Sequence, residues 1–258
     1  MFVNWRRGEE MNVSANSYTP GEVSAEDEER STSAWPSSMG TVPIDSPVIV
    51  GPTTPFDGCM KTYKRSNVVF RSGARMTRAN AVFVVQAGGT LSNVIIAGGG
   101  GVFCELQNCA FFRDSVQGAI HVNAGTGITT ITGGGARYVA RRIIFGQGSG
   151  TVVVSGDFLR INSGMLFESC GTCGPVKRGI IVDGAVSVNP TAELIRVNSN
   201  YNDIETVSRA TITTTNANYP ICSRFNGGIP AEQIGFGADP PVCSFSRSTV
   251  RIRPAARS

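Results

Sequence analysis

The sequence contains few histidines, lysines and aromatic residues, and it has no long hydrophobic runs. It holds one histidine, His121, and two tryptophans, and aromatic residues make up 8% of the 258 residues. Its lysines are Lys61, Lys64 and Lys177. No stretch is long and apolar enough for a membrane span, and the first residues lack the apolar core of a secretion signal. We therefore expect no membrane partner.

The charge is divided unevenly along the chain. Residues 1–45 carry eight acids and three arginines, about −5, whereas the whole chain is +4, so the remainder carries about +9. An arginine-rich body suits a carboxylated polysaccharide, a nucleic acid or an anionic surface, or it is simply a solvated surface. No run of basic residues with interleaved aromatics is present, so we expect no nucleic-acid partner.

Seven cysteines are more than a cytosolic chain of this size usually has, and they favour an oxidising compartment. An odd number leaves at least one unpaired. Cys170 and Cys173 in "SCGTC" have the spacing of half a zinc site, a redox pair or a local disulfide. Zinc needs four ligands, and a redox pair uses a helix N-terminus, for which the sequence gives no indication. The spacing alone leaves these three alternatives open.

Residues 1–54 are rich in Ser, Pro and acids, with little to bury, so we expect a disordered tail there and one domain over residues 55–258. Within that domain a short apolar stretch that leads into Gly, Asn or Gln recurs about every 18 to 29 residues. The phrases include "VFVVQAGG" from 82, "AIHVNAGTG" from 119, "IIFGQGSG" from 143, "LFESCG" from 166, "LIRVNSN" from 194 and "ICSRFNGG" from 221.

This recurrence predicts an all-β fold, a right-handed parallel β-helix, in which one phrase belongs to each coil. A single coil cannot bury its inner face, so stacks of Val, Ile, Leu and Phe should form the core, and Asn and Ser should form ladders at the corners. A Greek-key sandwich is the rival architecture, but a sandwich would not repeat in phase.

Several phrases in order resemble the family 3 pectate lyases over about residues 55–240: "FDGCMKTYKR" (56–65), "GGTLSNVIIAG" (88–98), "SCGTC" (169–173), "KRGIIVD" (177–183) and "VNSNYND" (197–203). The resemblance implies the same β-helix and a secreted protein. It also implies local pairing of Cys170 with Cys173. The remaining expected pairs are Cys104 with Cys109 and Cys222 with Cys243, which leaves Cys59 free.

The resemblance further implies β-elimination of polygalacturonate. A calcium ion bound by carboxylates acidifies the sugar C5 proton, and a basic side chain removes it. The three positions that hold calcium in the family are Gly100, Gln117 and Gly118 in this sequence, none of which carries a carboxylate. Asp114 is a nearby acid. We therefore expect no calcium site built from the three family positions.

The proposed catalytic positions are partly substituted. Arg142 stands at a family lysine and is the candidate base, and Arg178 stands at a family arginine and is a candidate substrate contact. Arg141 and Lys177 would extend a basic groove as substrate-binding residues. A family lysine and arginine are replaced by Met165 and Glu168.

Two other polar residues are expected to be structural. His121 is expected at a corner or on the surface, and Tyr201 is expected to belong to an Asn-rich coil corner.

The sequence thus predicts a degenerate pectate-lyase-like protein, monomeric, that binds an acidic polysaccharide or a partner with little or no lyase activity. One alternative is an active calcium-dependent lyase, with calcium as its cofactor. A second is a structural or interaction protein without a sugar ligand.

Overall fold

The computed structural model describes residues 36–69, 76–97, 100–104, 120–123 and 125–255. These residues form nineteen strands and two short 3-10 turns, η1 (Arg78–Asn80) and η2 (Ser199–Tyr201). No helix in the described part of the chain is long and apolar enough to cross a membrane.

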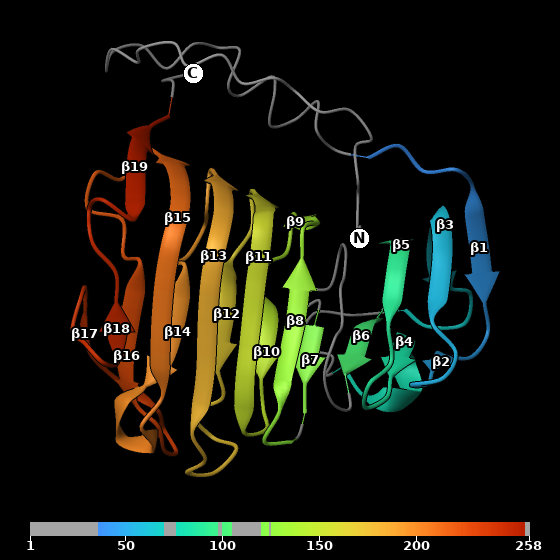
Figure 1. Ribbon diagram of the computed structural model, residues 1–258, viewed down its shortest axis with the longest axis horizontal. Helices are drawn as coiled ribbons and strands as arrows, with labels where there is room; N and C mark the ends of the chain where they lie inside the picture. The colour runs from blue at the N-terminus through green and yellow to red at the C-terminus, as the bar shows by residue number, and fades with distance from the viewer. Residues whose placement is uncertain (1–35, 70–75, 98–99, 105–119, 124, 256–258) are drawn as a thin grey trace.

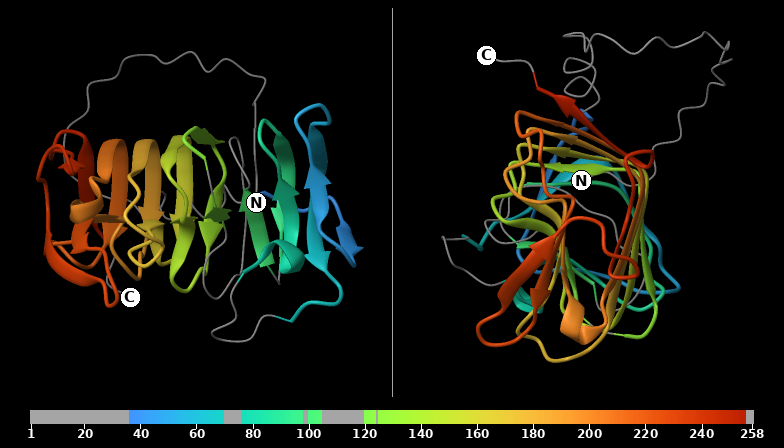
Figure 2. Two further views of the ribbon diagram at one scale, coloured as in Figure 1. Left: turned by 90° about the horizontal axis from the view of Figure 1, so that it is seen from below. Right: turned by 90° about the vertical axis from the view of Figure 1, so that its left-hand side faces the viewer.

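The strands form three sheets whose members come from successive coils (Figures 1 and 2). The nine-stranded sheet has the order β17 (Glu232–Phe236), β16 (Cys222–Asn226), β14 (Ile195–Asn198), β12 (Met165–Ser169), β10 (Arg142–Gly146), β7 (Ile120–Val122), β6 (Gly100–Cys104), β4 (Ala81–Val85), β2 (Val48–Val50). The seven-stranded sheet comprises β18 (Cys243–Ser244), β15 (Ile204–Thr214), β13 (Arg178–Val188), β11 (Gly150–Ile161) and β8 (Ile128–Thr132), with β19 (Val250–Pro254) on β15 and β9 (Gly135–Arg137) on β11. The third sheet comprises β1 (Thr41–Ile44), β3 (Phe56–Arg65) and β5 (Leu91–Ile96).

Pairing is parallel throughout these sheets except between β16 and β17, which are antiparallel. Seen along the long axis, the coils superpose around one interior (Figure 2). The predicted right-handed parallel β-helix is confirmed, and the Greek-key sandwich is excluded. Parallel strands joined coil by coil explain why the apolar phrases recur in phase along the sequence.

The core consists of ladders of apolar residues that occupy the same register position in successive coils. In the nine-stranded sheet one ladder runs through Phe83, Val102, Ile120, Ile144, Phe167, Ile195 and Cys222. Each of these side chains is buried, and burying a residue of this size contributes about 1.5–3 kcal/mol. The opposite wall contributes a matching ladder of Ile131, Val154, Val182 and Val207.

Polar residues at one corner hold neighbouring coils together. Asn198 Nδ2 donates to Ser169 Oγ at 2.9 Å, which is one rung of the predicted ladder. The Ser169 hydroxyl in turn donates to the buried Asp203 carboxylate at 2.6 Å. Tyr201 lies in η2, and its hydroxyl donates to the Gly171 carbonyl at 3.0 Å. The predicted corner role of Tyr201 is confirmed.

The predicted boundary between tail and domain at residue 54 is too late. Strand β1 pairs with β3, and β2 pairs with β4, so residues from Thr41 onward belong to the β-helix. The backbone partners in these sheets stabilise a segment whose composition alone indicated disorder. Residues 1–35 lie outside the described residues.

Two of the expected disulfides are present, Cys170–Cys173 and Cys222–Cys243, and Cys59 is free and exposed. The expected Cys104–Cys109 pair is not tested, because Cys109 lies outside the part of the chain that the structure describes.

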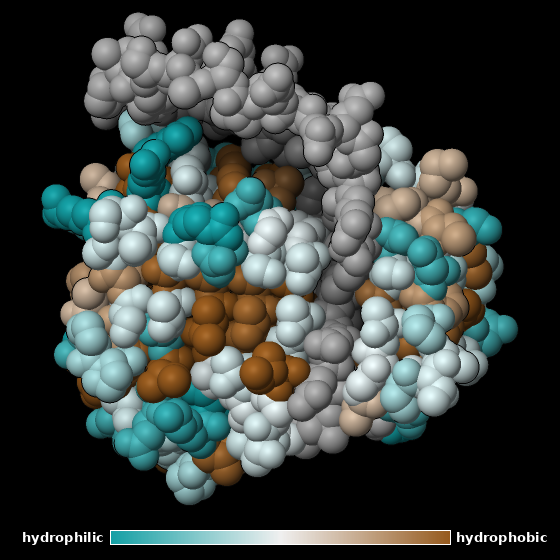
Figure 3. Space-filling model, viewed as in Figure 1, coloured by the Kyte–Doolittle hydropathy of each residue, from teal (hydrophilic) through white to brown (hydrophobic). Residues whose placement is uncertain are grey.

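The outer face of the seven-stranded sheet is partly apolar. Figure 3 shows a hydrophobic patch over its middle, surrounded by polar side chains. On β13 of this sheet, Ile181 is 40% exposed. On the outer face of the nine-stranded sheet, by contrast, charged and polar side chains line a groove.

Candidate functional site: an arginine-lined groove

The groove lies across the outer face of the nine-stranded sheet, and one row of its floor comes from a single register position. His121 on β7, Phe145 on β10, Glu168 on β12 and Arg196 on β14 are successive partners in the parallel pairing. Because alternate residues of a strand face the same side, these four side chains meet on the outer surface. The groove has a volume of about 570 Å³, a size typical of ligand sites.

Three arginines converge on Glu168, whose side chain is 7% exposed. Arg142 Nη1 donates to its Oε2 at 2.6 Å, and Arg141 Nη2 donates to its Oε1 at 2.8 Å. Arg196 Nη1 lies 3.6 Å from the same Oε1, while its Nε and Nη2 donate to Glu193 at 2.9 and 2.7 Å. We call these five residues the groove cluster. With three cations and two anions, it carries one positive charge in excess.

Aromatic rings support two of the guanidinium groups. The Arg142 guanidinium carbon lies 3.6 Å from the centroid of the Phe145 ring, and that of Arg196 lies 4.3 Å from the Phe225 ring centroid. Stacking of this kind fixes a planar cation in one orientation. Arg141 is the most accessible of the three, with 52% of its side chain exposed. Arg141 is therefore the guanidinium group of this cluster that is most open to solvent.

Burial changes the acid–base properties of the groove floor. Desolvation lowers the pKa of Arg142, although Glu168 opposes this and Arg141 adds to it. Burial, followed by the charge of Arg142, lowers the pKa of His121 to about 4. His121 is thus neutral at neutral pH, and its Nδ1 lies 3.2 Å from Gln147 Oε1. The expectation of a corner or surface histidine is wrong, because His121 sits within β7 and is buried.

Arg178 and Lys177 are not among the described residues that line this groove. Arg178 is 2% exposed, and its guanidinium donates to the carbonyl oxygens of Gln147 and Val176 at 2.8 and 2.9 Å. Its side chain therefore holds the turns between coils. Lys177 is exposed. Arg141 and Arg142, by contrast, lie in the groove as the sequence predicts.

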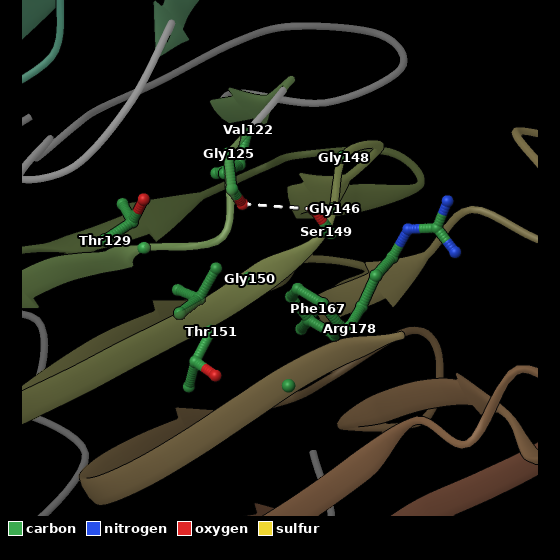
Figure 4. A pocket seen from close by; sticks show the side chains of 13 residues that line it. Val122, Gly125, Thr129, Gly146, Gly148, Ser149, Gly150, Thr151, Phe167 and Arg178 are labelled. Carbon is green, nitrogen blue, oxygen red and sulfur yellow. Dashed lines mark hydrogen bonds between the residues drawn. The ribbon is translucent and has the colours of Figure 1, made fainter. Parts of the chain in front are cut away.

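A second hollow adjoins the stem of Arg178 and is bordered by glycines. In Figure 4 the stem passes Phe167, and the guanidinium points away from Gly146, Gly148 and Gly150. The hollow has a volume of about 10 Å³, enough for roughly one water molecule. It is too small for a sugar, so the groove is the candidate site.

The described part of the groove does not fit a calcium ion. Among the described residues that line it, Glu168 is the one acid, and both of its oxygens accept hydrogen bonds from arginines. Calcium takes six to eight oxygen ligands with carboxylates among them, and three guanidinium groups repel a divalent cation. Gly100 begins β6, while Asp114, Gln117 and Gly118 lie outside the described residues.

Among the described residues, one other group of metal-ligating side chains lies close together. Ligand atoms of Glu205, Cys222 and Cys243 lie within 4.8 Å of one another and are buried. The two sulfurs form a disulfide, so they are not available as thiolate ligands.

Sequence reasoning missed Arg196, Phe145 and Phe225. Alignment of the repeat phrases on their strands would have found two of them, since "AIH", "IIF", "LFE" and "LIR" end on the four residues of the floor row. Residues in the third position of each phrase become neighbours when coils stack in register. Phe225 carries no comparable signal, because it lies two residues beyond that position.

The chain matches the family model described as pectate lyase over residues 32–230. It is similar to a probable pectate lyase D and to pectate lyase H of Emericella nidulans, at 33% and 35% identity. These alignments cover 78% and 77% of this chain and 76% of each relative.

Solved structures show the same likeness. A pectate lyase from Erwinia chrysanthemi in complex with tetragalacturonic acid has a TM-score of 0.61 at 27% identity, covering 79% of this chain and 70% of that one. A pectate lyase from Pectobacterium carotovorum has a TM-score of 0.67 at 22% identity and shows the common fold, covering 79% of this chain and 67% of that one. One family model matches most of this chain, and the alignments cover about three quarters of each relative. The chain therefore belongs to the pectate lyase family.

Proposed function

We propose that this protein binds an acidic polysaccharide, pectate or polygalacturonate, in the groove and has little or no lyase activity. The observation that carries the proposal is the pairing of Glu168 with Arg141 and Arg142. Arg142, the residue at the family lysine position, has its charge neutralised by a buried carboxylate. Burial lowers the pKa of Arg142, but Glu168 stabilises the protonated form and opposes this, so Arg142 is a poorer proton acceptor than it would be without the carboxylate.

The binding half of the proposal is supported by charge and shape. The groove cluster has an excess of one positive charge, and Arg141 is half exposed. A guanidinium group binds a carboxylate through two parallel hydrogen bonds, so Arg141 and Arg196 are suited to the carboxylates of galacturonate. A similar solved structure contains tetragalacturonic acid, so oligogalacturonates are the first ligands to test.

The loss of catalysis is supported by the substitutions around the cluster. Met165, which stands at a second family lysine, pairs in register with Arg142 and is buried. A thioether neither accepts a proton at neutral pH nor attracts the sugar carboxylate. Among the described lining residues, the groove thus has neither the second lysine nor the calcium-binding carboxylates that the resemblance implies.

The second candidate is an active calcium-dependent lyase. It is favoured by family membership and by the lowered pKa of the buried Arg142, because a depressed pKa is what a catalytic base needs. For both candidate functions, the two disulfides are consistent with a secreted protein. We also propose that the protein acts as a monomer.

Retention on immobilised polygalacturonate at low ionic strength tests the proposed binding. We expect the wild type to be retained and the double variant Arg141→Ala, Arg196→Ala to elute earlier. The double variant Arg209→Ala, Arg251→Ala is the matched control, since both residues are exposed arginines on the other sheet and their loss removes the same two charges. No retention of the wild type would favour a structural protein without a sugar ligand, whereas equal retention of all three proteins would place the binding outside the groove.

A further inference from the structure

The Glu168 carboxylate lies where the groove arginines would hold a carboxylate of a ligand. Its Oε1 is flanked by Arg141 from the preceding coil and by Arg196 from the following coil, at 2.8 and 3.6 Å. Its Oε2 is bound by the deeper Arg142. Guanidinium groups on both sides of one carboxylate form the arrangement by which proteins bind acidic ligands.

We propose that Glu168 is an internal counter-ion that competes with an acidic ligand for the groove cluster, and that a ligand carboxylate binds by displacing Glu168 from Arg141. The inference rests on the proposed binding of an acidic polysaccharide and adds an autoinhibitory contact to it. Glu168 thereby sets how tightly the groove binds a polyanion.

Burial and exposure determine which contact is displaced. Arg142 is 7% exposed at its side chain, and its bond to Oε2 is shielded by the Phe145 ring. Arg141 is 52% exposed and Arg196 is 27% exposed. Screening by water weakens the Arg141–Glu168 pair relative to the buried one. An incoming carboxylate can therefore exchange with Oε1 at Arg141 while Oε2 stays on Arg142.

The charge count gives the expected direction of a substitution. With Glu168 present the cluster has one positive charge in excess; with a neutral residue it has two, and Arg142 loses its counter-ion. A buried cation without a partner is unfavourable, so the variant should be less stable alone and should gain more from a bound anion.

The test compares Glu168→Gln with the wild type, with Asp183→Asn as the matched control. Asp183 forms an exposed ion pair with Arg209 at 2.7 Å, on β13 of the other sheet, so its substitution makes the same change in net charge away from the groove. Trigalacturonate affinity is measured by calorimetry at low salt. Inorganic sulfate is the second probe, read as the shift in Tm.

We expect Glu168→Gln to bind trigalacturonate about tenfold tighter than the wild type, as the gain of one charge-assisted contact implies. Sulfate should raise its Tm more than that of the wild type or of Asp183→Asn. Equal or weaker trigalacturonate binding together with an equal sulfate shift would overturn the inference. If Glu168→Gln does not fold, Glu168→Asp serves instead, because the shorter side chain cannot keep both oxygens on the arginines; unchanged affinity would again overturn it.

The two proposals fail differently. If the wild type binds trigalacturonate, while Glu168→Gln binds it no better and sulfate shifts the Tm of both proteins equally, the counter-ion role is wrong and the proposed function stands. If neither protein binds trigalacturonate but sulfate stabilises Glu168→Gln selectively, the proposed function is wrong and the counter-ion role stands.

Discussion

Replacement of Glu205 by Gln should lower the unfolding free energy at pH 4.5 and raise it above about pH 8. Glu205 on β15 is fully buried beside the Cys222–Cys243 disulfide. Its Oε2 accepts the Ser244 N–H at 2.9 Å, whereas Oε1 has no partner among the described residues. Burial raises the pKa of Glu205 from 4.5 to about 8, and the Ser244 hydrogen bond opposes part of this.

The sign follows from proton uptake. Between pH 4.5 and about 8 the folded protein keeps a proton on Glu205 that the unfolded chain has released. The contribution of Glu205 to the unfolding free energy is complete below pH 4.5 and falls by about 1.4 kcal/mol per pH unit up to about pH 8. Across the whole window the loss is on the order of 5 kcal/mol.

Glu205→Gln removes this dependence but has its own cost. The amide oxygen can still accept the Ser244 N–H, whereas the buried amide NH₂ lacks an acceptor, which costs about 1–3 kcal/mol. We therefore expect the variant to be less stable than the wild type at pH 4.5 and more stable above about pH 8, with the two curves crossing near pH 6.

Urea unfolding monitored by circular dichroism from pH 4.5 to 9 measures the difference in unfolding free energy. Glu232→Gln, at an exposed position on β17, is the control and should show a small, flat difference. A pH-independent offset between Glu205→Gln and the wild type would refute the reasoning, since it would mean that Glu205 titrates alike in both states.

Two further predictions concern residues that hold the coils together. Arg178→Ala should lower the unfolding free energy by about 3 kcal/mol, because it removes a buried side chain whose guanidinium group binds the partly buried carbonyl oxygens of Gln147 and Val176. The folded variant should keep its retention on polygalacturonate, and lost retention at unchanged Tm would instead assign Arg178 to binding. Replacing both cysteines of Cys222–Cys243 with Ala should lower the unfolding free energy by about 3 kcal/mol, and the same change at Cys170–Cys173 should lower it by about 2 kcal/mol. The difference arises because the first disulfide closes a loop with a sequence separation of 21 residues and the second one of 3. Urea unfolding should give that order, and the reverse order would contradict the loop-entropy argument.

The fold was predictable because its signal repeats. Phe167 or Ile144 alone indicates only a buried residue, but apolar phrases that recur in phase favour stacked coils, and the register confirms that these two residues are neighbours. The start of the domain was not predictable in this way. Strands β1 and β2 lie in a segment rich in Ser and Pro, and their pairing with β3 and β4 depends on contacts distant in sequence.

The site was predictable only in part. Arg141 and Arg142 follow a local motif, and both line the groove. Glu168 was recognised as a reversed charge, but its partner Arg196 comes from the next coil, so pairing them requires the register of β12 and β14. Arg178 has the same side-chain chemistry as Arg142, and only its burial against backbone carbonyls separates a structural arginine from one in the groove.

Our central proposal is that this family member binds carboxylates in its groove, while Glu168, the one acid among the described lining residues, contributes to the loss of β-elimination. Incubation of the wild type with polygalacturonate and calcium, followed by ultraviolet absorbance of unsaturated uronate, tests it most directly. We predict no increase above a protein-free control over hours. A calcium-dependent increase that a chelator abolishes would contradict the account.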